Sequence, residues 1–127
     1  MLQGLDAIDW SSWETAYGPA TGVPDQLRAI AGDDVAAARS ALDRLESSVN
    51  HQGLASLAAV PTTPFLVAIG RERPTPRLVR LLADLGCAGS HAFVAGGEPL
   101  SDTLLPELQP VRDAVAGAFD LFAGLLD

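Results

Sequence analysis

One cysteine and two histidines are the residues of this chain whose types could bind a soft metal. Cys87 and His91 are separated by three residues, whereas His51 lies far from both in the sequence. A structural zinc site usually needs four closely spaced ligands, most often with paired cysteines. Because a fourth ligand is missing, we predict no metal site and no cofactor. His51 is expected to end a helix, where an imidazole can bond the last carbonyls.

Residues for nucleophilic or phosphate chemistry lack the necessary pattern. Ser90 and His91 are adjacent, but no Gly-x-Ser-x-Gly elbow or comparable signature brings a nucleophile next to a base. The segment 95–99 has two glycines but lacks the Lys-Ser/Thr pair of a phosphate loop. The sequence therefore predicts no catalytic residues and a protein that is not an enzyme.

Acidic residues dominate the charge of the chain. Sixteen Asp and Glu against eight basic residues, all of them Arg, give a net charge of -8. The pairs Asp6/Asp9 and Asp33/Asp34 are explained as helix caps or solvated charges. Because the arginines are scattered and nucleic-acid binding needs clustered cations, we expect no nucleic-acid partner. A basic protein partner is expected instead, since opposite charge raises association rates.

Length and composition fit one globular domain over residues 1–127. The apolar fraction is 48%, and the single cysteine cannot form an intrachain disulfide. The first residues lack the basic and apolar regions of an export signal, and no run reaches the ~18 apolar residues of a membrane span. These features predict a cytoplasmic protein with no membrane partner.

Proline and glycine divide the chain into helical segments. A segment that opens with Pro and closes with Gly is typical of a helix, because the first turn needs no amide from Pro and Gly tolerates the left-handed C-cap. Such helices are predicted over Pro24 to Gly32, Pro64 to Gly70, Pro76 to Gly86 and Pro110 to about Gly124. Thr63 and Thr75 are predicted N-caps. Alternating strand patterns are nearly absent, so the predicted fold class is all-α.

A fifth helix is predicted over Asp33 to Asn50, with Asp33 or Asp34 as its cap. Its apolar residues recur at three- and four-residue steps and predict a buried stripe of Val35, Ala38, Leu42, Leu45 and Val49. Arg39, Asp43, Glu46 and Asn50 form the opposite, solvated face. Arg39 and Asp43 are predicted to pair at i,i+4.

The two central helices are predicted to form an antiparallel hairpin. Phe65 to Ile69 is apolar without a break, which places that helix at the centre of the domain. The next helix carries a conventional apolar stripe of Leu78, Leu81, Leu82 and Leu85, with Arg77, Arg80 and Asp84 outside. The short connection Gly70 to Pro74 forces antiparallel neighbours. Residues Cys87 to Leu108 are predicted to be a long loop.

The last predicted helix has one broad apolar sector. It comprises Val111, Ala114, Val115, Ala118, Phe119, Leu121, Phe122, Leu125 and Leu126. Such a terminal helix either closes the core or forms a seam with a second copy. A homodimer through Val111 to Leu126 therefore remains open.

The segment Val23 to Asp34, followed by the helix Val35 to Val49, resembles a HEAT repeat: a short helix, an acidic turn, then an Ala-rich helix. The resemblance covers roughly residues 23 to 86. One departure is that the Val-Arg pair that usually opens the second helix aligns with Ala37-Ala38, which leaves Arg39 one position late. The resemblance implies a short α-solenoid of antiparallel helical hairpins.

Three short segments, Ile8-Asp9-Trp10, Ala16 to Ala20 and His51-Gln52-Gly53, resemble small actinobacterial HEAT-type proteins. Some bacterial helical-repeat proteins of this size resemble immunity proteins, which block a cognate toxin by binding it. The resemblance implies a non-enzymatic inhibitor of a basic toxin. The alternatives are an enzyme or ligand-carrying domain on a helical-repeat scaffold and a homodimeric structural module.

The candidate partner-binding residues are Trp10, Trp13, Glu14, Tyr17, Asp43 and Glu46. The first four cluster near the N-terminus, and large aromatic residues are enriched among interface hot spots. The alternative is that the aromatic residues cap the first repeat, with Trp13 and Tyr17 stacked at i,i+4 and the indole N–H groups bonded to backbone.

Overall fold

The computed structural model describes residues 2–51, 54–55, 57–87, 94–95, 98–99 and 109–118. In these residues the chain is mainly helical, which confirms the all-α prediction. The α-helices are α1 (Val23–Ala31), α2 (Val35–Val49), α3 (Ala59–Glu72), α4 (Pro76–Cys87) and α5 (Gln109–Gly117). Two 3-10 turns precede them, η1 (Leu5–Ala7) and η2 (Trp10–Ser12). In the described part of the chain, no helix is long and apolar enough to cross a membrane.

Three antiparallel hairpins of two residues per strand lie between the helical segments in the described part of the chain. They pair β1 (Glu14–Thr15) with β2 (Gly18–Pro19), β3 (Asn50–His51) with β4 (Leu54–Ala55), and β5 (Val94–Ala95) with β6 (Glu98–Pro99). The backbone of the first hairpin is fixed to the helices, because Ala16 N–H donates to the Ser48 carbonyl and Ala58 N–H donates to the Glu14 carbonyl. The last hairpin lies within the predicted loop Cys87 to Leu108, the rest of which after Cys87 falls outside the described residues.

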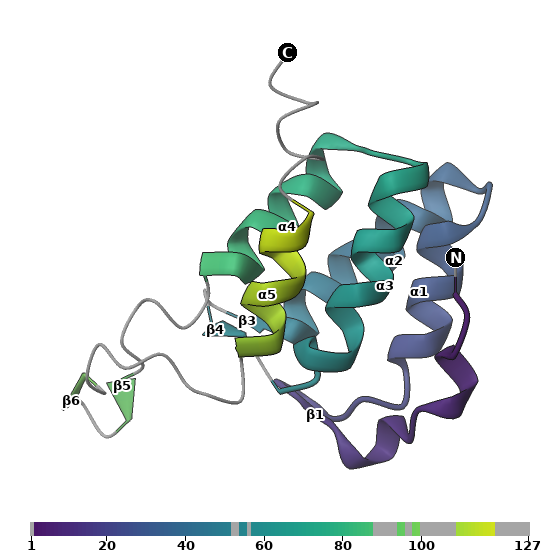
Figure 1. Ribbon diagram of the computed structural model, residues 1–127. Coiled ribbons are helices and arrows are strands. Elements are labelled where there is room, and N and C mark those ends of the chain that lie inside the picture. The colour runs from purple at the N-terminus through teal and green to yellow at the C-terminus, as the bar shows by residue number, and fades with distance from the viewer. Residues whose placement is uncertain are drawn as a thin grey trace.

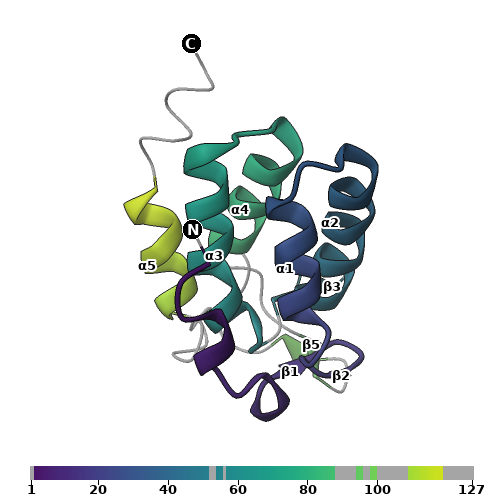
Figure 2. The ribbon, with the colours of Figure 1, turned by 90° about the vertical axis from the view of Figure 1, so that its right-hand side faces the viewer.

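The helices pack as two antiparallel pairs with α5 beside the second pair. Helix α1 contacts both α2 and α3, and α5 contacts both α3 and α4 (Figure 1). Figure 2 shows α5, α3 and α1 side by side. The α1–α2 turn and the α3–α4 turn therefore lie at the same end of the molecule.

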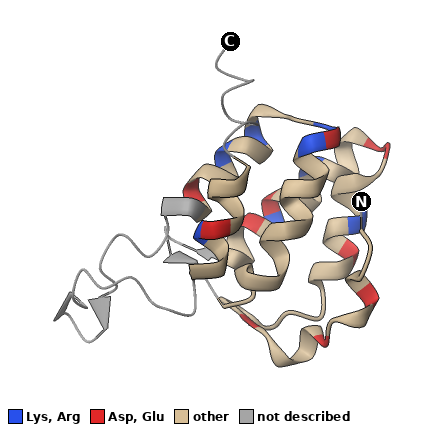
Figure 3. Ribbon diagram, viewed as in Figure 1, with Lys and Arg blue, Asp and Glu red and all other residues tan. Residues whose placement is uncertain are grey.

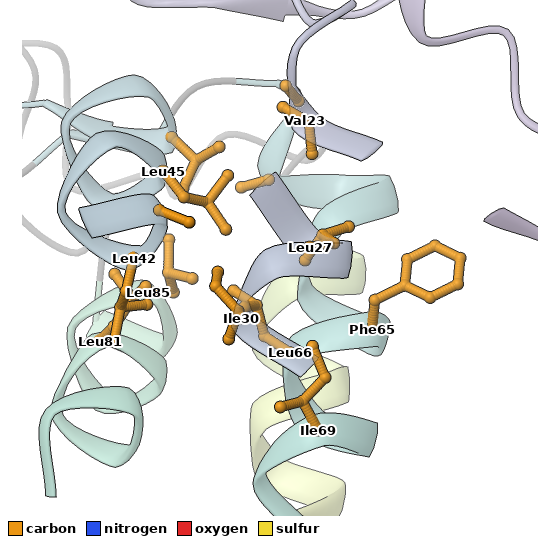
Figure 4. Close-up of a cluster of buried hydrophobic side chains, with 14 of the residues drawn as sticks. Val23, Leu27, Ile30, Leu42, Leu45, Phe65, Leu66, Ile69, Leu81 and Leu85 are labelled. Carbon is orange, nitrogen blue, oxygen red and sulfur yellow. The ribbon is translucent and has the colours of Figure 1, made fainter. Parts of the chain in front are cut away.

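Buried aliphatic side chains from α1 to α4, together with Val111 of α5, form one core, part of which Figure 4 shows. The largest fully covered ones are Leu27, Leu45, Leu66, Ile69, Leu78, Leu81, Leu82, Leu85, Val23, Val49 and Val111. The predicted leucine stripe of α4 is confirmed, since all four leucines are buried, whereas Arg77, Arg80 and Asp84 are exposed.

The caps of α2 and α4 follow from short polar side chains. Asp34 Oδ1 accepts the Ala37 N–H at 3.1 Å, so of the two predicted alternatives Asp34 is the cap. Thr75 Oγ1 accepts the Leu78 N–H at 3.2 Å, which confirms the predicted cap of α4.

Helix α3 begins five residues before the predicted start. Pro64 lies inside the helix and is exposed, so the prediction that it opens the helix is wrong. Thr63 is likewise not an N-cap, because it is buried in the helix and its hydroxyl donates to the Ala59 carbonyl at 2.7 Å. The physical reason is upstream: Ala58 and Ala59 are completely buried, and helical backbone from that point lets them pack. The α3–α4 connection is consequently Arg73 to Thr75, shorter than predicted.

The predicted stripe of α2 is buried over only part of its length. Leu42, Leu45 and Val49 are buried, as predicted, and Ala38 is half-buried. Val35 is 73% exposed, so its assignment to the core is wrong. In the first turn of α2, residues 35–37 are all exposed, and periodicity alone cannot show where a neighbour stops covering a helix.

Helix α5 covers the second hairpin. Val111, Val115 and Ala118 are buried within the single chain. This part of the predicted apolar sector is therefore core and does not form a homodimer seam. The rest of the predicted seam, Phe119 to Leu126, lies outside the described residues.

Candidate functional site

A groove lies between the α1–α2 turn and the α3–α4 turn, with a volume of about 680 Å³. Its lining comes from four helices and two turns: Ile30, Gly32, Asp33, Val35, Ala38, Arg39, Leu42, Ile69, Arg73, Thr75, Pro76, Arg77 and Leu78. A volume of this size is within the range of ligand pockets. The groove therefore is a candidate binding site.

The floor of the groove is apolar. Ile30, Leu42, Ile69 and Leu78 belong to the hydrophobic core and present their outer atoms to the groove. Val35 lies at its edge and is one of the few large apolar side chains that the described part of the chain exposes. An apolar floor beside an exposed valine favours binding of another apolar surface.

One end of the groove is closed by Arg73 from the α3–α4 turn. Its Nη1 donates to the Gly32 carbonyl at 2.7 Å, and its Nη2 lies 2.6 Å from Asp33 Oδ1. Both partners belong to the α1–α2 turn. The guanidinium thereby joins the two turns and is already committed to partners within the chain.

A second arginine, Arg77 of α4, is held by two carboxylates of α2. Its Nη2 lies 3.0 Å from Glu46 Oε2, and its Nη1 contacts Asp43 Oδ1. The hydrogen bond to Glu46 is the main cause that raises the pKa of Arg77 above its ordinary value. Burial lowers the pKa by less than this bond raises it, and the charges of Asp43 and Glu46 add smaller increases. Asp43 thus pairs with Arg77, and the predicted pairing of Asp43 with Arg39 is wrong. The fold brings α4 beside α2 and so supplies a partner that the helix's own sequence does not contain.

Arg39 differs from the other two groove arginines. It is exposed, it follows Ala38 on the groove face of α2, and no described residue makes an ion pair or hydrogen bond with it. The arginines of α4 and of the end of α3 appear in blue in Figure 3. In a chain of net charge -8, Arg39 leaves one uncommitted positive charge on the wall of an apolar groove.

The structure places Trp10 in the core. It is 6% exposed, its Nε1 donates to the Leu5 carbonyl at 2.9 Å, and its ring lies 6.2 Å from that of Phe65. The role of an exposed partner anchor is therefore wrong for Trp10. The alternative, a capping tryptophan whose indole N–H bonds to backbone, describes this residue.

Trp13, Glu14 and Tyr17 lie on and around the first hairpin. Trp13 is half-buried against the core, Glu14 is exposed and Tyr17 is 69% exposed. Because β1 lies between Trp13 and Tyr17, and Tyr17 is in the hairpin turn, the helical i,i+4 spacing on which their stacking was predicted does not exist. Glu14 and Tyr17 are at the surface, where a partner can reach them.

Asp43 and Glu46 join α2 to α4 through Arg77. Their oxygens are engaged by the guanidinium, although both side chains keep partial exposure to solvent. The ion pairs with Arg77 therefore give a structural role to the two acidic residues that the sequence analysis assigned to partner binding. The structure does not group them with Trp10, which lies in the core.

The remaining candidates from the sequence that the structure describes have structural roles. Asp9 caps the turn η2 by accepting the Ser11 N–H, and Asp6 pairs with Arg28 of α1. Ser90 and His91 lie outside the described residues. Among the residues that the structure does describe, no three His, Cys, Asp or Glu side chains lie close enough to hold a metal ion.

Comparison of the chain with protein-family models, with curated proteins and with solved structures finds no match. The site is therefore assigned from its own geometry.

Sequence reasoning missed the groove and its arginines. A signal was present, because Val35, Ala38 and Leu42 share one face of α2 and Arg39 lies beside it. The polar segment Arg71-Glu72-Arg73 between two apolar helices was another signal. What the sequence could not supply is that the two helix turns meet at one end of the fold.

Proposed function

We propose that this protein is a non-enzymatic protein-binding module whose receiving surface is the groove between the two helix turns. The observation that carries the proposal is that the chain leaves the start of the apolar stripe of α2 uncovered. Val35 is exposed there, beside a groove floor of core side chains. Burying such a surface against a partner removes apolar area from water, which is the main driving force of association. No catalytic residue is required for this role.

The scaffold for this function is a short HEAT-like α-solenoid. The pairs α1–α2 and α3–α4 act as two successive repeats, and α5 lies against the second as a terminal helix. In helical repeats each unit contacts its neighbours, and a row of equivalent turns forms an extended binding surface. The groove between the two turns is such a surface.

The proposal is tested with two neighbouring substitutions on α2. Val35→Glu places a carboxylate in the groove, whereas Ala36→Glu places one on an exposed position that does not line it. Both tagged variants are expressed in the source organism at the native level, and the proteins that copurify are quantified. The expected result is a specific partner that Val35→Glu loses and Ala36→Glu retains. Equal recovery with both variants would exclude the groove as the receiving surface.

A second candidate function is inhibition of a basic toxin in the manner of an immunity protein. Two observations favour it: the net charge of -8, and the exposure of Glu14 and Tyr17 on a hairpin whose backbone is fixed to α2 and α3. Opposite charge would steer a basic partner toward this face. The affinity between this protein and a basic toxin would then fall steeply with added salt, because salt screens the attraction between exposed charges.

The two candidates predict different sensitive residues. If the N-terminal hairpin is the interface, Tyr17→Ala speeds dissociation of the partner, Glu14→Lys slows its association, and Val35→Glu has no effect. Surface plasmon resonance at two salt concentrations measures all three. Salt-independent affinity for a partner of acidic pI would remove the case for a basic toxin.

A further inference from the structure

The first half of α2 has an apolar face that its own chain does not cover. Burial on this helix begins at Ala41 and continues through Leu42, Leu45 and Val49, whereas Val35 is exposed and Ala38 is only half-buried. The same stripe therefore serves the core at one end and the groove at the other. A partner would supply the missing neighbour of Val35 and Ala38.

Among the charged residues that line the groove, three are arginines and one is an aspartate. Arg39 lies one helical turn after Val35, where side chains four residues apart are neighbours on the helix surface. Arg73 and Arg77 also line the groove, but both are engaged, by Asp33 and by the Asp43–Glu46 pair respectively. Arg39 is thus the groove arginine that makes no ion pair with any described residue.

The walls of the groove offer side chains and few free backbone groups. Beyond their first turns the helices use their backbone amides internally. In the first turns of α2 and α4, Asp34 caps the Ala37 amide and Thr75 caps the Leu78 amide, and the Gly32 carbonyl between α1 and α2 accepts from Arg73. An extended peptide binds mainly by adding backbone hydrogen bonds to a strand edge, and no such edge lines the groove. A helix satisfies its own backbone and needs only side-chain contacts, so it suits these walls.

We propose that the groove receives an amphipathic α-helix of a partner protein that carries an Asp or Glu one turn from its apolar contact residues, and that this carboxylate pairs with Arg39. The apolar side chains of the partner helix cover Val35, Ala38 and the floor at Leu42. The planar guanidinium of Arg39 can hold a carboxylate through two parallel hydrogen bonds, which fixes the register of the helix. This inference rests on the proposed protein-binding function and adds the chemistry of the partner.

The experiment begins with photo-crosslinking in the full-length protein. Benzoylphenylalanine is placed at position 35, which lines the groove, and in the control at position 36, which does not. After irradiation in the source organism, the crosslinked segment is identified by mass spectrometry. We expect a segment captured from position 35 and not from position 36, with apolar residues at three- and four-residue spacing and an Asp or Glu one turn away.

The second part measures the charge pair with that segment as a synthetic peptide. Arg39→Gln is expected to weaken binding about tenfold, and Arg39→Lys to weaken it less because the charge remains. Replacing the peptide's carboxylate by its amide should abolish the difference in affinity between the native protein and the Arg39→Gln variant, as a double-mutant cycle requires for a direct pair. Circular dichroism of each Arg39 variant provides the folding control, since the residue is exposed.

The outcomes separate this inference from the proposed function. Absence of any crosslink specific to position 35 overturns both. A position-35 crosslink to a segment without a carboxylate, or peptide binding that Arg39→Gln does not weaken, leaves the protein-binding function and overturns the acidic helix. Capture of a second copy of this chain overturns the partner protein and makes the groove a homodimer contact.

Discussion

Arg77 on α4 is bonded to Glu46 on α2, with 3.0 Å between Nη2 and Oε2. The same guanidinium contacts Asp43, which precedes Glu46 by one helical turn. The three charges link the two helical hairpins beside the groove. Arg77 is 43% exposed, so solvent screens the network and limits what it adds to stability.

Arg77→Gln is expected to lower the free energy of unfolding by about 1 kcal/mol at most, because exposed ion pairs contribute little individually. A double-mutant cycle with Glu46→Gln should give a coupling of a few tenths of a kcal/mol, measured by urea denaturation. The pKa of Arg77 is raised, so its contribution is fully present at neutral pH and is lost only as the pH rises through the folded-state pKa. Arg80→Gln, an exposed change on the same helix, should alter stability by less than about 0.5 kcal/mol. Equal effects at positions 77 and 80 would contradict an interhelical role.

Leu42→Ala and Val35→Ala test the two halves of the α2 stripe. Leu42 is 6% exposed, and its truncation should cost roughly 2 to 5 kcal/mol through lost burial and a cavity. Val35 is exposed, and its truncation should change the unfolding free energy by less than about 0.5 kcal/mol. Chemical denaturation measures both. A cost above about 1 kcal/mol at position 35 would show that the chain itself covers this residue.

The two tryptophans should respond differently to solvent. Trp10 is buried and bonded to the Leu5 carbonyl, whereas Trp13 is only partly buried. In the Trp13→Phe protein the remaining indole should emit at shorter wavelength and resist acrylamide quenching. In the Trp10→Phe protein quenching should be stronger, and the Leu5 carbonyl left without its donor should cost about 1 to 3 kcal/mol of stability. Similar quenching of both proteins would place Trp10 at the surface.

Pro64 and Pro61 provide a matched pair within α3. Pro64 lies in the helix interior, where it removes an amide that would otherwise bond the Val60 carbonyl. Pro64→Ala should therefore raise the free energy of unfolding by about 1 to 3 kcal/mol. Part of this gain is offset, because replacing Pro increases the conformational entropy of the unfolded chain. Pro61→Ala should gain less, because Pro61 lies in the first turn, where the amide has no partner within the helix. Thermal unfolding compares the two variants, and the absence of a gain at position 64 would move the start of α3 toward the predicted one.

Features that depend on neighbours along the chain could be predicted from the residues alone. Period and punctuation placed α1 and α4 within a residue or two, and the leucine stripe of α4 was assigned correctly. Thr75 was also recognised as a cap, because capping is a contact over three residues. These features need only the geometry of one helix, which the local sequence specifies.

Packing between distant segments determines which helix faces are covered and which charges pair. Val35 has the same periodicity as Leu42, yet it is exposed because no other part of the described chain covers it. Asp43 lies four residues after Arg39, yet it pairs with Arg77, because the packing of α4 against α2 places Arg77 beside it. The groove and its uncommitted Arg39 likewise arise where two turns, far apart in the chain, meet at one end of the fold. Contacts between segments far apart in the chain determine these features, and the pattern within one segment does not contain them.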